Sequence, residues 1–254
     1  MQKRKLDWKP KFDPRSRSYG IKSIVDSSKI EDTSVLWPEG IVLDQGAEGA
    51  CVGFGWAGDV LAEPVSPKTQ PTPEKGNADA ISYYKRAQKI DEWPGEDYEG
   101  TSVLAGAKVM KELGFISEYR WCFSIEELKA AVISQGPVVI GIPWHSSMYE
   151  TDQSGIVRIY GENVGGHCIL ITGYVSNMMV DGVKQEVFRW RNSWGRSYGI
   201  GGSAFITYSD LETLVKNNAE MCVPIGRSMP SEPTSLTTEG FCSKMFTAVK
   251  NKFL

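Results

Sequence analysis

The spacing of the apolar residues changes near residue 136, and this change limits the folds open to the chain. Before that point, apolar residues recur every three or four positions, as they do on one face of a helix. After it, short apolar runs alternate with glycine, proline and polar residues, as expected for strands. Helices that come first and strands that come second indicate an α+β protein with two segregated lobes. A site built from both lobes would lie in the cleft between them.

Four helices are predicted in the first part of the chain. One begins near Cys51 and ends before Pro64, and its interior glycines each cost up to about 1 kcal/mol of helix propensity, which indicates close packing against a neighbour. Gly114 is expected to end the third helix in a left-handed conformation. Ser124 and Glu127 form a capping box at the start of the fourth. The last three predicted helices span residues 77–93, 102–113 and 124–135.

The remaining segments are less regular. Residues 64–76 read as a surface loop because they are rich in proline and polar residues. Four strands are predicted after residue 136, at residues 137–143, 168–174, 186–191 and 203–207.

The chain divides into a body and two terminal segments. Residues 1–35 are polar and are predicted to form an extension that packs across the body, which spans residues 36–225. Residues 226–254 contain a linker rich in proline, serine and threonine, followed by an amphipathic helix at 239–254. This helix either docks back on the body, binds a partner or lies on a membrane surface.

Composition excludes several classes of function. With 254 residues, the chain fits one two-lobed body better than two independent domains. Its 28 basic and 31 acidic residues nearly balance, so no nucleic-acid partner is expected. No apolar run approaches the roughly 18 residues needed to span a bilayer, so no transmembrane segment is expected. The basic N-terminus lacks the apolar stretch of a secretory signal peptide.

Cysteine and histidine usage favours thiols over metal ligands. The two histidines, His145 and His167, are too few for a multi-histidine metal site, and we expect neither a metal nor another cofactor. Without a secretory signal, the cysteines are expected to be reduced in a cytoplasm. Five cysteines occur, at positions 51, 122, 168, 222 and 242.

Cys51 is the first candidate for chemistry. It follows a glycine-rich turn and stands at the predicted start of a helix, where unpaired N–H groups and the helix dipole favour a thiolate. The same N–H groups can receive a developing oxyanion, and the side-chain amide of Gln45, six residues earlier, can add another donor. Taken alone, Cys51 is more often a buried structural cysteine.

His167 and Asn192 each stand next to a predicted strand. His167 follows two glycines, which leave room beside the imidazole. The carbonyl of Asn192 can accept the imidazole N–H and so fix the orientation and tautomer of the ring. Taken singly, His167 would more often be a structural residue and Asn192 a turn residue.

The three residues together resemble the papain family of cysteine peptidases. The run Gln45-Gly-Ala-Glu-Gly-Ala-Cys51-Val-Gly-Phe54 resembles its nucleophile block, with the same spacing of six from Gln to Cys. The run Gly166-His-Cys-Ile-Leu-Ile-Thr-Gly-Tyr174 resembles its histidine block. The run Asn192-Ser-Trp-Gly-Arg-Ser-Tyr-Gly-Ile-Gly-Gly202 resembles its asparagine block, with Tyr198 in place of a second Trp. The similarity covers roughly residues 36–225. The chain resembles short bacterial and bacteriophage members of the family more than lysosomal ones.

Spacing in the chain agrees partly with the family. Papain-family enzymes carry their His and Asn about 130–150 residues after the cysteine. Here Asn192 lies 141 residues after Cys51 and His167 lies 116 after it, a shortfall that we attribute to trimmed loops. The resemblance implies two lobes, a helical one followed by an antiparallel β lobe, with the active-site cleft between them.

The resemblance also implies a role for each residue. Cys51 would attack the substrate carbonyl as a thiolate paired with protonated His167, which Asn192 would orient. Gln45 and the N–H of Cys51 would stabilise the oxyanion. Trp194 would shield the bond between the imidazole and the asparagine, and it is also a candidate substrate-binding residue.

Several positions depart from the family pattern. Glu48 replaces a cysteine that is usually tied in a disulfide, and its charge would raise the thiol pKa unless it points outward. Val52 replaces the usual Trp after the nucleophile. The glycine pair that binds the substrate main chain has no clear match, and Gly100 and Thr101 are the best candidates for that role. About 35 residues are too few for the usual prodomain, so either the N-terminal extension covers the cleft or activity is restrained by compartment or timing.

Three hypotheses follow. The first is an active cysteine peptidase that hydrolyses peptide bonds through an acyl-enzyme intermediate, in a bacterial or phage-infected cytoplasm. The second is a catalytically weak protein of the same fold that serves as a structural or interaction component, possibly in a virion. The third keeps the thiol chemistry with a different substrate, either a cell-wall peptide amide or an acyl acceptor other than water.

Overall fold

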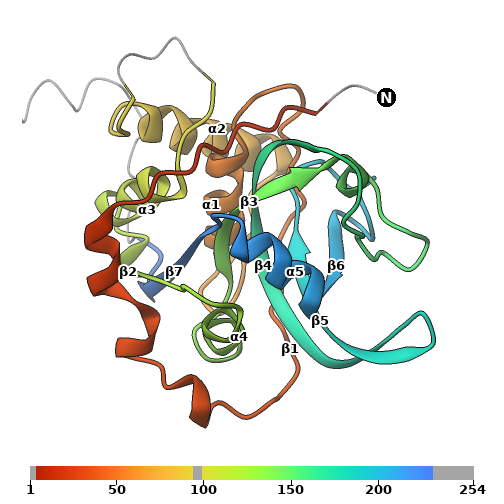
Figure 1. Cartoon of the computed structure of the whole chain (residues 1–254). Coiled ribbons are helices and arrows are strands. Elements are labelled where there is room, and N and C mark those ends of the chain that lie inside the picture. Colours follow the sequence, from red (N-terminus) through yellow and green to blue (C-terminus); the bar gives the residue numbers. More distant parts are fainter. Residues whose placement is uncertain (1–3, 94–98, 231–254) are drawn as a thin grey trace, which may run out of the picture.

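The computed structural model describes residues 4–93 and 99–230 (Figure 1). Its helices are α1 (Cys51–Leu61), α2 (Pro73–Gln88), α3 (Val103–Glu112), α4 (Ile125–Ser134) and α5 (Tyr208–Lys216). Its strands are β1 (Val35–Leu36), β2 (Ile116–Trp121), β3 (Val138–His145), β4 (Asn163–Val180), β5 (Val183–Arg191), β6 (Ser203–Thr207) and β7 (Glu220–Arg227). Short 3-10 turns lie at Pro14–Tyr19, Ile21–Ser23, Ser27–Lys29 and Ser146–Tyr149. In the described part of the chain, no helix is long and apolar enough to cross a bilayer.

One antiparallel sheet organises the molecule. Its strand order is β2-β7-β3-β4-β5-β6, and the short β1 pairs with β4. The sheet is antiparallel throughout, and helices precede most of its strands, so the predicted α+β class is confirmed. The long strand β4 occupies a central position, where it pairs with β3 on one side and β5 on the other.

The two faces of the sheet bury different cores. Val139 of β3 and Leu170 of β4 face the core that contains α1, α2 and α3. Their neighbours Ile140 and Ile171 face the opposite core, which contains α4 and α5. This alternation follows from the two-residue period of a strand. Because both faces are covered, these strands are apolar at successive positions, as their sequence indicated.

The glycines of α1 allow two neighbours to approach closely. A Cβ at Gly53 would lie 2.2 Å from the carbonyl oxygen of Ala80 in α2. A Cβ at Gly55 would lie 2.8 Å from the sulfur of Cys168 in β4. The prediction that this glycine-rich helix packs closely against its surroundings is confirmed. Because α1 is held directly against β4, its first residue is brought near the residues that precede Cys168.

Helix boundaries agree with the sequence where capping residues mark them. Ser124 accepts a hydrogen bond from the N–H of Glu127 at 3.2 Å, as the capping box requires. The reciprocal half differs, because the carboxylate of Glu127 accepts from the N–H of Phe123 rather than from that of Ser124. Gly114 follows α3 with φ +81°, as predicted.

The second helix was placed wrongly by sequence. It begins at Pro73 and ends at Gln88, whereas residues 77–93 were predicted. Thr72 caps its start by accepting from the N–H of Lys75, and Pro73 suits the first helical turn because it lacks an N–H. The predicted loop at 64–76 is therefore too long at its C-terminal end. The sequence also gave no prediction for β2, α5 or β7.

The N-terminal residues cross the body and form only three short 3-10 turns before β1. In Figure 1 the red N-terminal segment passes in front of α1 and continues to the left edge of the view. We call residues 4–9 the N-terminal strap. The predicted helix at 239–254 lies outside the described residues.

Candidate active site

Cys51 is the first residue of α1 and is fully buried. The residue before it, Ala50, provides no side-chain cap, so the first N–H groups of the helix are not taken by a capping side chain. Complete burial raises the pKa of the Cys51 thiol to about 11. This effect outweighs the main-chain hydrogen bonds from Asp7, Cys168 and Val52, which lower the pKa. The thiol is therefore neutral at neutral pH in this structure. The contact with the main chain of Cys168 places the sulfur beside the residue that follows His167.

His167 and Asn192 form a buried hydrogen-bonded pair. Nε2 of His167 lies 2.8 Å from Oδ1 of Asn192. The same oxygen accepts from the N–H of Ser193 at 2.7 Å, which fixes the orientation of the amide. Because Oδ1 can only accept, Nε2 must carry a proton, and neutral His167 has its lone pair on Nδ1. Nδ1 is buried and has no hydrogen-bond partner, so it is the nitrogen that can exchange a proton with a thiol.

Two indole rings enclose this pair. Trp194 lies over the imidazole of His167 with ring centroids 4.7 Å apart and planes tilted by 31°. Trp144 packs edge-on against the same imidazole, also at 4.7 Å. Burial lowers the pKa of His167 to about 4, and the bond to Asn192 only partly offsets this effect. Tyr198, which stands where a second Trp is usual, packs edge-on against Trp194.

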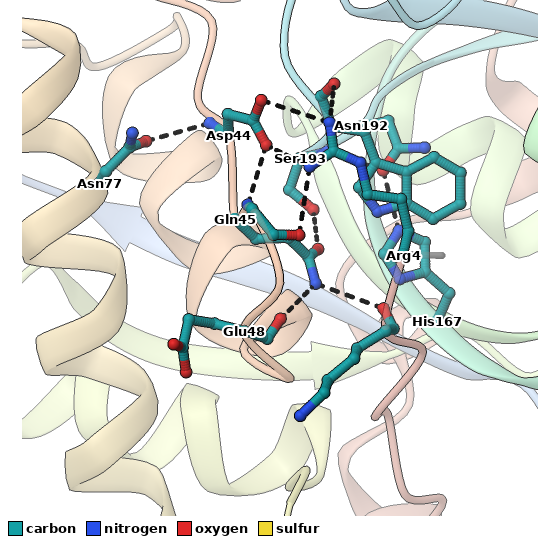
Figure 2. A network of polar contacts seen from close by, with 11 residues as sticks. Arg4, Asp44, Gln45, Glu48, Asn77, His167, Asn192 and Ser193 are labelled. Atoms are coloured by element: carbon teal, nitrogen blue, oxygen red, sulfur yellow. Dashed lines mark hydrogen bonds and ion pairs between the residues drawn. The ribbon is translucent and has the colours of Figure 1, made fainter. Parts of the chain in front are cut away.

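The side chain of Gln45 is held at both ends (Figure 2). Its Oε1 accepts from the hydroxyl of Ser193 at 2.5 Å. Its Nε2 donates to the carbonyl of Glu48 at 2.7 Å and to the carbonyl of Lys5 at 3.3 Å. An amide nitrogen has two N–H groups, so both are used, one within the turn before α1 and one toward the N-terminal strap.

The main chain of the N-terminal strap bonds to both sides of the site. The N–H of Trp8 donates to the carbonyl of Gly166, directly before His167, at 3.0 Å. On the other side, Thr101 accepts from the N–H of Lys9 at 3.0 Å and donates to the carbonyl of Asp7 at 3.2 Å. The strap thus pairs like an added strand with segments from the helical part and from the sheet.

Close approach of the strap requires glycine on one of these walls. Gly100 has φ +90°, a conformation that side chains disfavour, and a Cβ there would lie 2.2 Å from the carbonyl oxygen of Asp7. On the turn before the nucleophile, a Cβ at Gly49 would also lie 2.2 Å from Asp7, at its carboxylate. Gly49 and Gly100, which both contact Asp7, therefore leave room for the strap because they lack side chains.

Polar side chains anchor the N-terminal end of the strap. Arg4 forms an ion pair with Asp44 at 2.6 Å and donates to the carbonyl of Trp194 at 3.2 Å (Figure 2). Lys5 forms an ion pair with Glu99. These pairs are exposed, so each contributes modestly, about 0.2–1 kcal/mol. Together with the buried main-chain bonds, they hold the strap over Cys51 and His167.

Comparison with known families agrees with this geometry. The model of papain family cysteine proteases matches residues 76–222, which is more than half of the chain. The chain belongs to the papain family of cysteine proteases. The match includes His167 and Asn192 and begins after Cys51 and Gln45, so the assignment of those two residues rests on their motif and their position in the structure. No curated protein sequence matches the chain.

Solved structures of papain-family cysteine proteases share this fold. Xylellain, a cysteine protease from Xylella fastidiosa, superimposes with a TM-score of 0.61 at 19% identity, over 90% of this chain and 99% of xylellain. Digestive procathepsin L 3 from the larval midgut of Tenebrio molitor gives a TM-score of 0.54 at 14% identity, over 87% of this chain and 83% of that one. At such low identities the likeness establishes the fold alone.

The candidate residues of this papain-family chain converge on one place. Those that touch the strap are Gln45, Cys51, Gly100, Thr101 and Trp194. His167 directly follows Gly166, which the strap contacts, and Asn192 is hydrogen-bonded to His167. Glu48 is exposed, and the acid that lies beside Cys51 is instead Asp7, whose charge opposes ionisation of the thiol.

Sequence reasoning missed Asp7, Trp144 and Ser193, which complete the site. Each acts through a contact with a segment far away in sequence, and although Ser193 stands within the asparagine block, nothing in that block indicates its bond to Gln45. The signal that was available for the strap was a single Trp8 in an otherwise charged N-terminal stretch. Among the described residues, no group of three His, Cys, Asp or Glu side chains is arranged to hold a metal ion.

Proposed function

We propose that this papain-family chain is a cysteine peptidase that uses Cys51 as nucleophile, His167 as general base and acid, and Asn192 as the residue that orients the imidazole. The observation that carries the proposal is the hydrogen bond between Nε2 of His167 and Asn192, which leaves Nδ1 unpartnered on a residue adjacent to Cys168. The main chain of Cys168 in turn contacts the sulfur of Cys51.

The first half of the reaction forms a thioester. The thiol proton of Cys51 passes to Nδ1 of His167, and the thiolate attacks the carbonyl carbon of the scissile peptide bond. The oxyanion accepts hydrogen bonds from the N–H of Cys51 and from Nε2 of Gln45. The imidazolium then gives its proton to the departing amine, so the C–N bond breaks and an acyl-enzyme remains.

The second half restores the enzyme. His167 takes a proton from water through Nδ1, and the hydroxide attacks the thioester carbonyl. The carboxylic acid product leaves as the sulfur of Cys51 recovers its proton from the imidazolium. Asn192 keeps Nε2 as the donor atom throughout, so Nδ1 alone exchanges protons with the reacting groups.

The strap-covered structure is a latent form of the enzyme. Cys51 and His167 are fully buried, and burial raises the thiol pKa to about 11 and lowers the imidazole pKa to about 4. At pH 7 both groups are therefore neutral, whereas the reactive pair is a thiolate and an imidazolium. Displacement of the N-terminal strap would admit water and substrate and would favour the ion pair. Of the two restraints that the sequence suggested, we therefore propose the first, in which the N-terminal extension covers the cleft.

A second candidate function is that of a catalytically weak structural or interaction protein, for example a virion component. The same burial favours it, since a permanently covered pair would never react. Its distinguishing property is that Cys51 would remain unreactive under every condition that keeps the protein folded.

We propose a protein or peptide substrate and a reducing compartment, such as a bacterial or phage-infected cytoplasm. The four described cysteines, at positions 51, 122, 168 and 222, are free and buried, and Glu48 stands where a disulfide partner is usual in the family.

Labelling with a peptidyl epoxide that alkylates papain-type thiols separates the two functions. The full chain carrying Arg4→Ala, which loosens the strap over the site, is incubated with the epoxide at pH 7 and the label is located by mass spectrometry. The peptidase proposal predicts selective labelling of Cys51 that is lost in His167→Ala. Labelling of Cys242 and other thiols that is unchanged by His167→Ala would contradict it. Val175→Ala, a substitution in β4 outside the site, provides the matched control.

A further inference from the structure

The proposed reaction leaves one buried hydroxyl near the site without a role, that of Tyr198. The ring of Tyr198 packs edge-on against Trp194 with centroids 5.2 Å apart, and Trp194 in turn lies over the imidazole of His167. Tyr198 is only 5% exposed, so its hydroxyl needs partners inside the protein. It also stands where the papain family usually has a second Trp, so any role of the hydroxyl belongs to this chain.

The loop after β5 brings Tyr198 back to Asn192. The N–H of Asn192 donates to the carbonyl of Gly202 at 3.0 Å, and the N–H of Gly202 donates to the carbonyl of Tyr198 at 2.9 Å. Gly202 has φ +94°, a conformation that side chains disfavour, so glycine permits this return. Asn192 and Tyr198 are therefore linked through the main chain of a single residue.

The proton of the Tyr198 hydroxyl is directed at a carbonyl. The hydroxyl donates to the carbonyl of Met148 at 3.2 Å. A carbonyl oxygen can only accept, so the hydroxyl must be the donor in this bond. Toward its other neighbours, the oxygen of Tyr198 therefore presents only its two lone pairs.

Two buried N–H groups lie against those lone pairs. Nδ2 of Asn192 and Nε1 of Trp190 are buried, and neither is hydrogen-bonded to any other described group. Burial raises the pKa of the Tyr198 hydroxyl, and the side chains of Trp190 and Asn192 lower it, as N–H groups directed at its oxygen do. A buried N–H without an acceptor is unfavourable, so Tyr198 provides the acceptor that both nitrogens need.

We propose that the hydroxyl of Tyr198 is a positioning group for catalysis, which accepts from Nδ2 of Asn192 and so keeps Oδ1 turned toward His167. The inference rests on the proposed function and deepens it, because it names a residue that acts on the reaction through Asn192. If the amide turned over, Nδ2 would face Nε2 of His167. The imidazole proton would then have to move to Nδ1, which could no longer take the proton of Cys51.

This support requires an oxygen at position 198. The N–H of an indole can only donate, so the Trp that is usual in the family cannot accept from Nδ2 of Asn192. At the other end of the same amide, the N–H of Ser193 donates to Oδ1 at 2.7 Å. In this chain the amide of Asn192 is therefore held at both ends.

Hydrogen exchange at His167 tests the proposal without requiring catalysis. The Nε2–H signal is followed by NMR in the full chain carrying Cys51→Ala, with and without Tyr198→Phe. The chain has only two histidines, so His145→Gln identifies the signal. We expect Nε2–H to exchange about 5–30-fold faster in Tyr198→Phe, because Asn192 loses a hydrogen bond that holds its amide. Equal exchange rates with and without Tyr198→Phe would overturn the inference.

A second tyrosine on the same indole provides the matched control. Tyr149 stacks on Trp194 with centroids 5.5 Å apart, and its hydroxyl makes no hydrogen bond within the described part of the chain. Tyr149→Phe should leave the exchange of Nε2–H at His167 unchanged. Equal acceleration in Tyr149→Phe and Tyr198→Phe would mean that the aromatic cluster has loosened as a whole, and would refute a specific role for Tyr198.

Kinetics separate positioning from a merely structural role. In the Arg4→Ala background, Tyr198→Phe should lower kcat for a peptide amide about 3–30-fold and leave KM unchanged, because the hydroxyl does not touch substrate. Asn192 would then stabilise the imidazolium of His167 less, so the alkaline limit of kcat/KM should move to lower pH by about half a unit or more. An unaltered pH limit, or a change in KM alone, would contradict the assignment.

Tyr198→Trp covers the case in which Tyr198→Phe does not fold, because it introduces the residue that is usual in the family. Its indole cannot accept from Nδ2 of Asn192, so it should also accelerate exchange at His167. The failure of this inference is distinct from that of the proposed function. Faster exchange in Tyr198→Phe while epoxide labelling of Cys51 fails supports the positioning of Asn192 against the peptidase, and labelling of Cys51 with unchanged exchange does the opposite.

Discussion

The side-chain amide of Gln45 donates one hydrogen bond to the carbonyl of Glu48 at 2.7 Å and the other to the carbonyl of Lys5 at 3.3 Å. The first bond lies within the turn before α1, and the second is made to the N-terminal strap. The N–H that we assign to the oxyanion is therefore occupied by the chain itself. As a result, Nε2 of Gln45 cannot stabilise an oxyanion with this N–H while the strap is bound.

Weakening the anchor of the strap should expose the nucleophile. Arg4→Ala removes the ion pair with Asp44 and the bond to the carbonyl of Trp194. We expect the rate of Cys51 alkylation by iodoacetamide at pH 7 to rise about 3–30-fold, since an exposed ion pair and a hydrogen bond each contribute about 1 kcal/mol or less. Arg15→Ala, which removes an exposed ion pair outside the strap, is the control. An unchanged rate in Arg4→Ala would show that the strap does not limit access.

Loss of the amide donor should slow the chemical step itself. In the Arg4→Ala background, Gln45→Ala is expected to lower kcat for hydrolysis of a peptide amide about 10²–10³-fold, because one oxyanion donor is removed. Ser193→Ala removes the hydroxyl that holds Oε1 of Gln45 and keeps the donor, so its effect on kcat should be smaller. Equal effects of the two substitutions would argue that Gln45 only supports the turn.

The residues that could be predicted from the sequence carry local signals. Cys51 follows a glycine-rich turn and opens a helix, His167 lies in β4, and Asn192 directly follows β5. Each stands within a recognisable run, so each could be proposed from its immediate neighbours. The α+β class followed for the same reason, because the period of the apolar residues changes along the chain.

The parts that could not be predicted depend on contacts between distant segments. Trp8 and Glu220 are 212 residues apart. They meet only because the strap packs on Gly141 of β3, whose partner in the neighbouring strand β7 is Glu220. Strand β2 was missed because its middle residues are only partly buried, and it is stabilised by pairing with β7 about a hundred residues later. Neither the contact between Trp8 and Glu220 nor the pairing of β2 with β7 is marked by a residue pattern within the segments that form it.

Uncovering the site should change the pH dependence of thiol reactivity. In the covered form the thiol pKa is about 11, so the alkylation rate of Cys51 should keep rising with pH beyond 9, as the thiolate fraction grows. Trp8→Ala reduces the burial that raises this pKa and lowers that of His167, so the thiolate should form at lower pH beside a protonated imidazole. The measurement is the alkylation rate between pH 5 and 10. Identical profiles for both proteins would be evidence against a latent pair.

The stability of the folded chain should fall with rising pH because of Glu220. Burial raises the pKa of this carboxyl from its ordinary 4.5 to about 7, so between these values the folded state holds a proton that the unfolded state has released. Stability from this group is therefore present below about pH 4.5 and is lost as pH rises through 7. Glu220→Gln removes the dependence, so its Tm relative to the parent should increase over that window by a few degrees. A difference in Tm that is constant from pH 4.5 to 7.5 would contradict the shift.

Because the N-terminal strap is covalently attached to the body, any substrate must compete with it for the same site. A segment joined to the body by a short connection acts at an effective concentration on the order of millimolar, however weak its individual bonds are. A peptide with the sequence of residues 4–9, added in solution, would therefore inhibit far less than the same residues do in the intact chain. A single cut after residue 9, before the segment that Ile21 and Val25 bury against the body, would convert the strap into an ordinary dissociable ligand. The enzyme would then be activated by dilution, without any change in the catalytic residues.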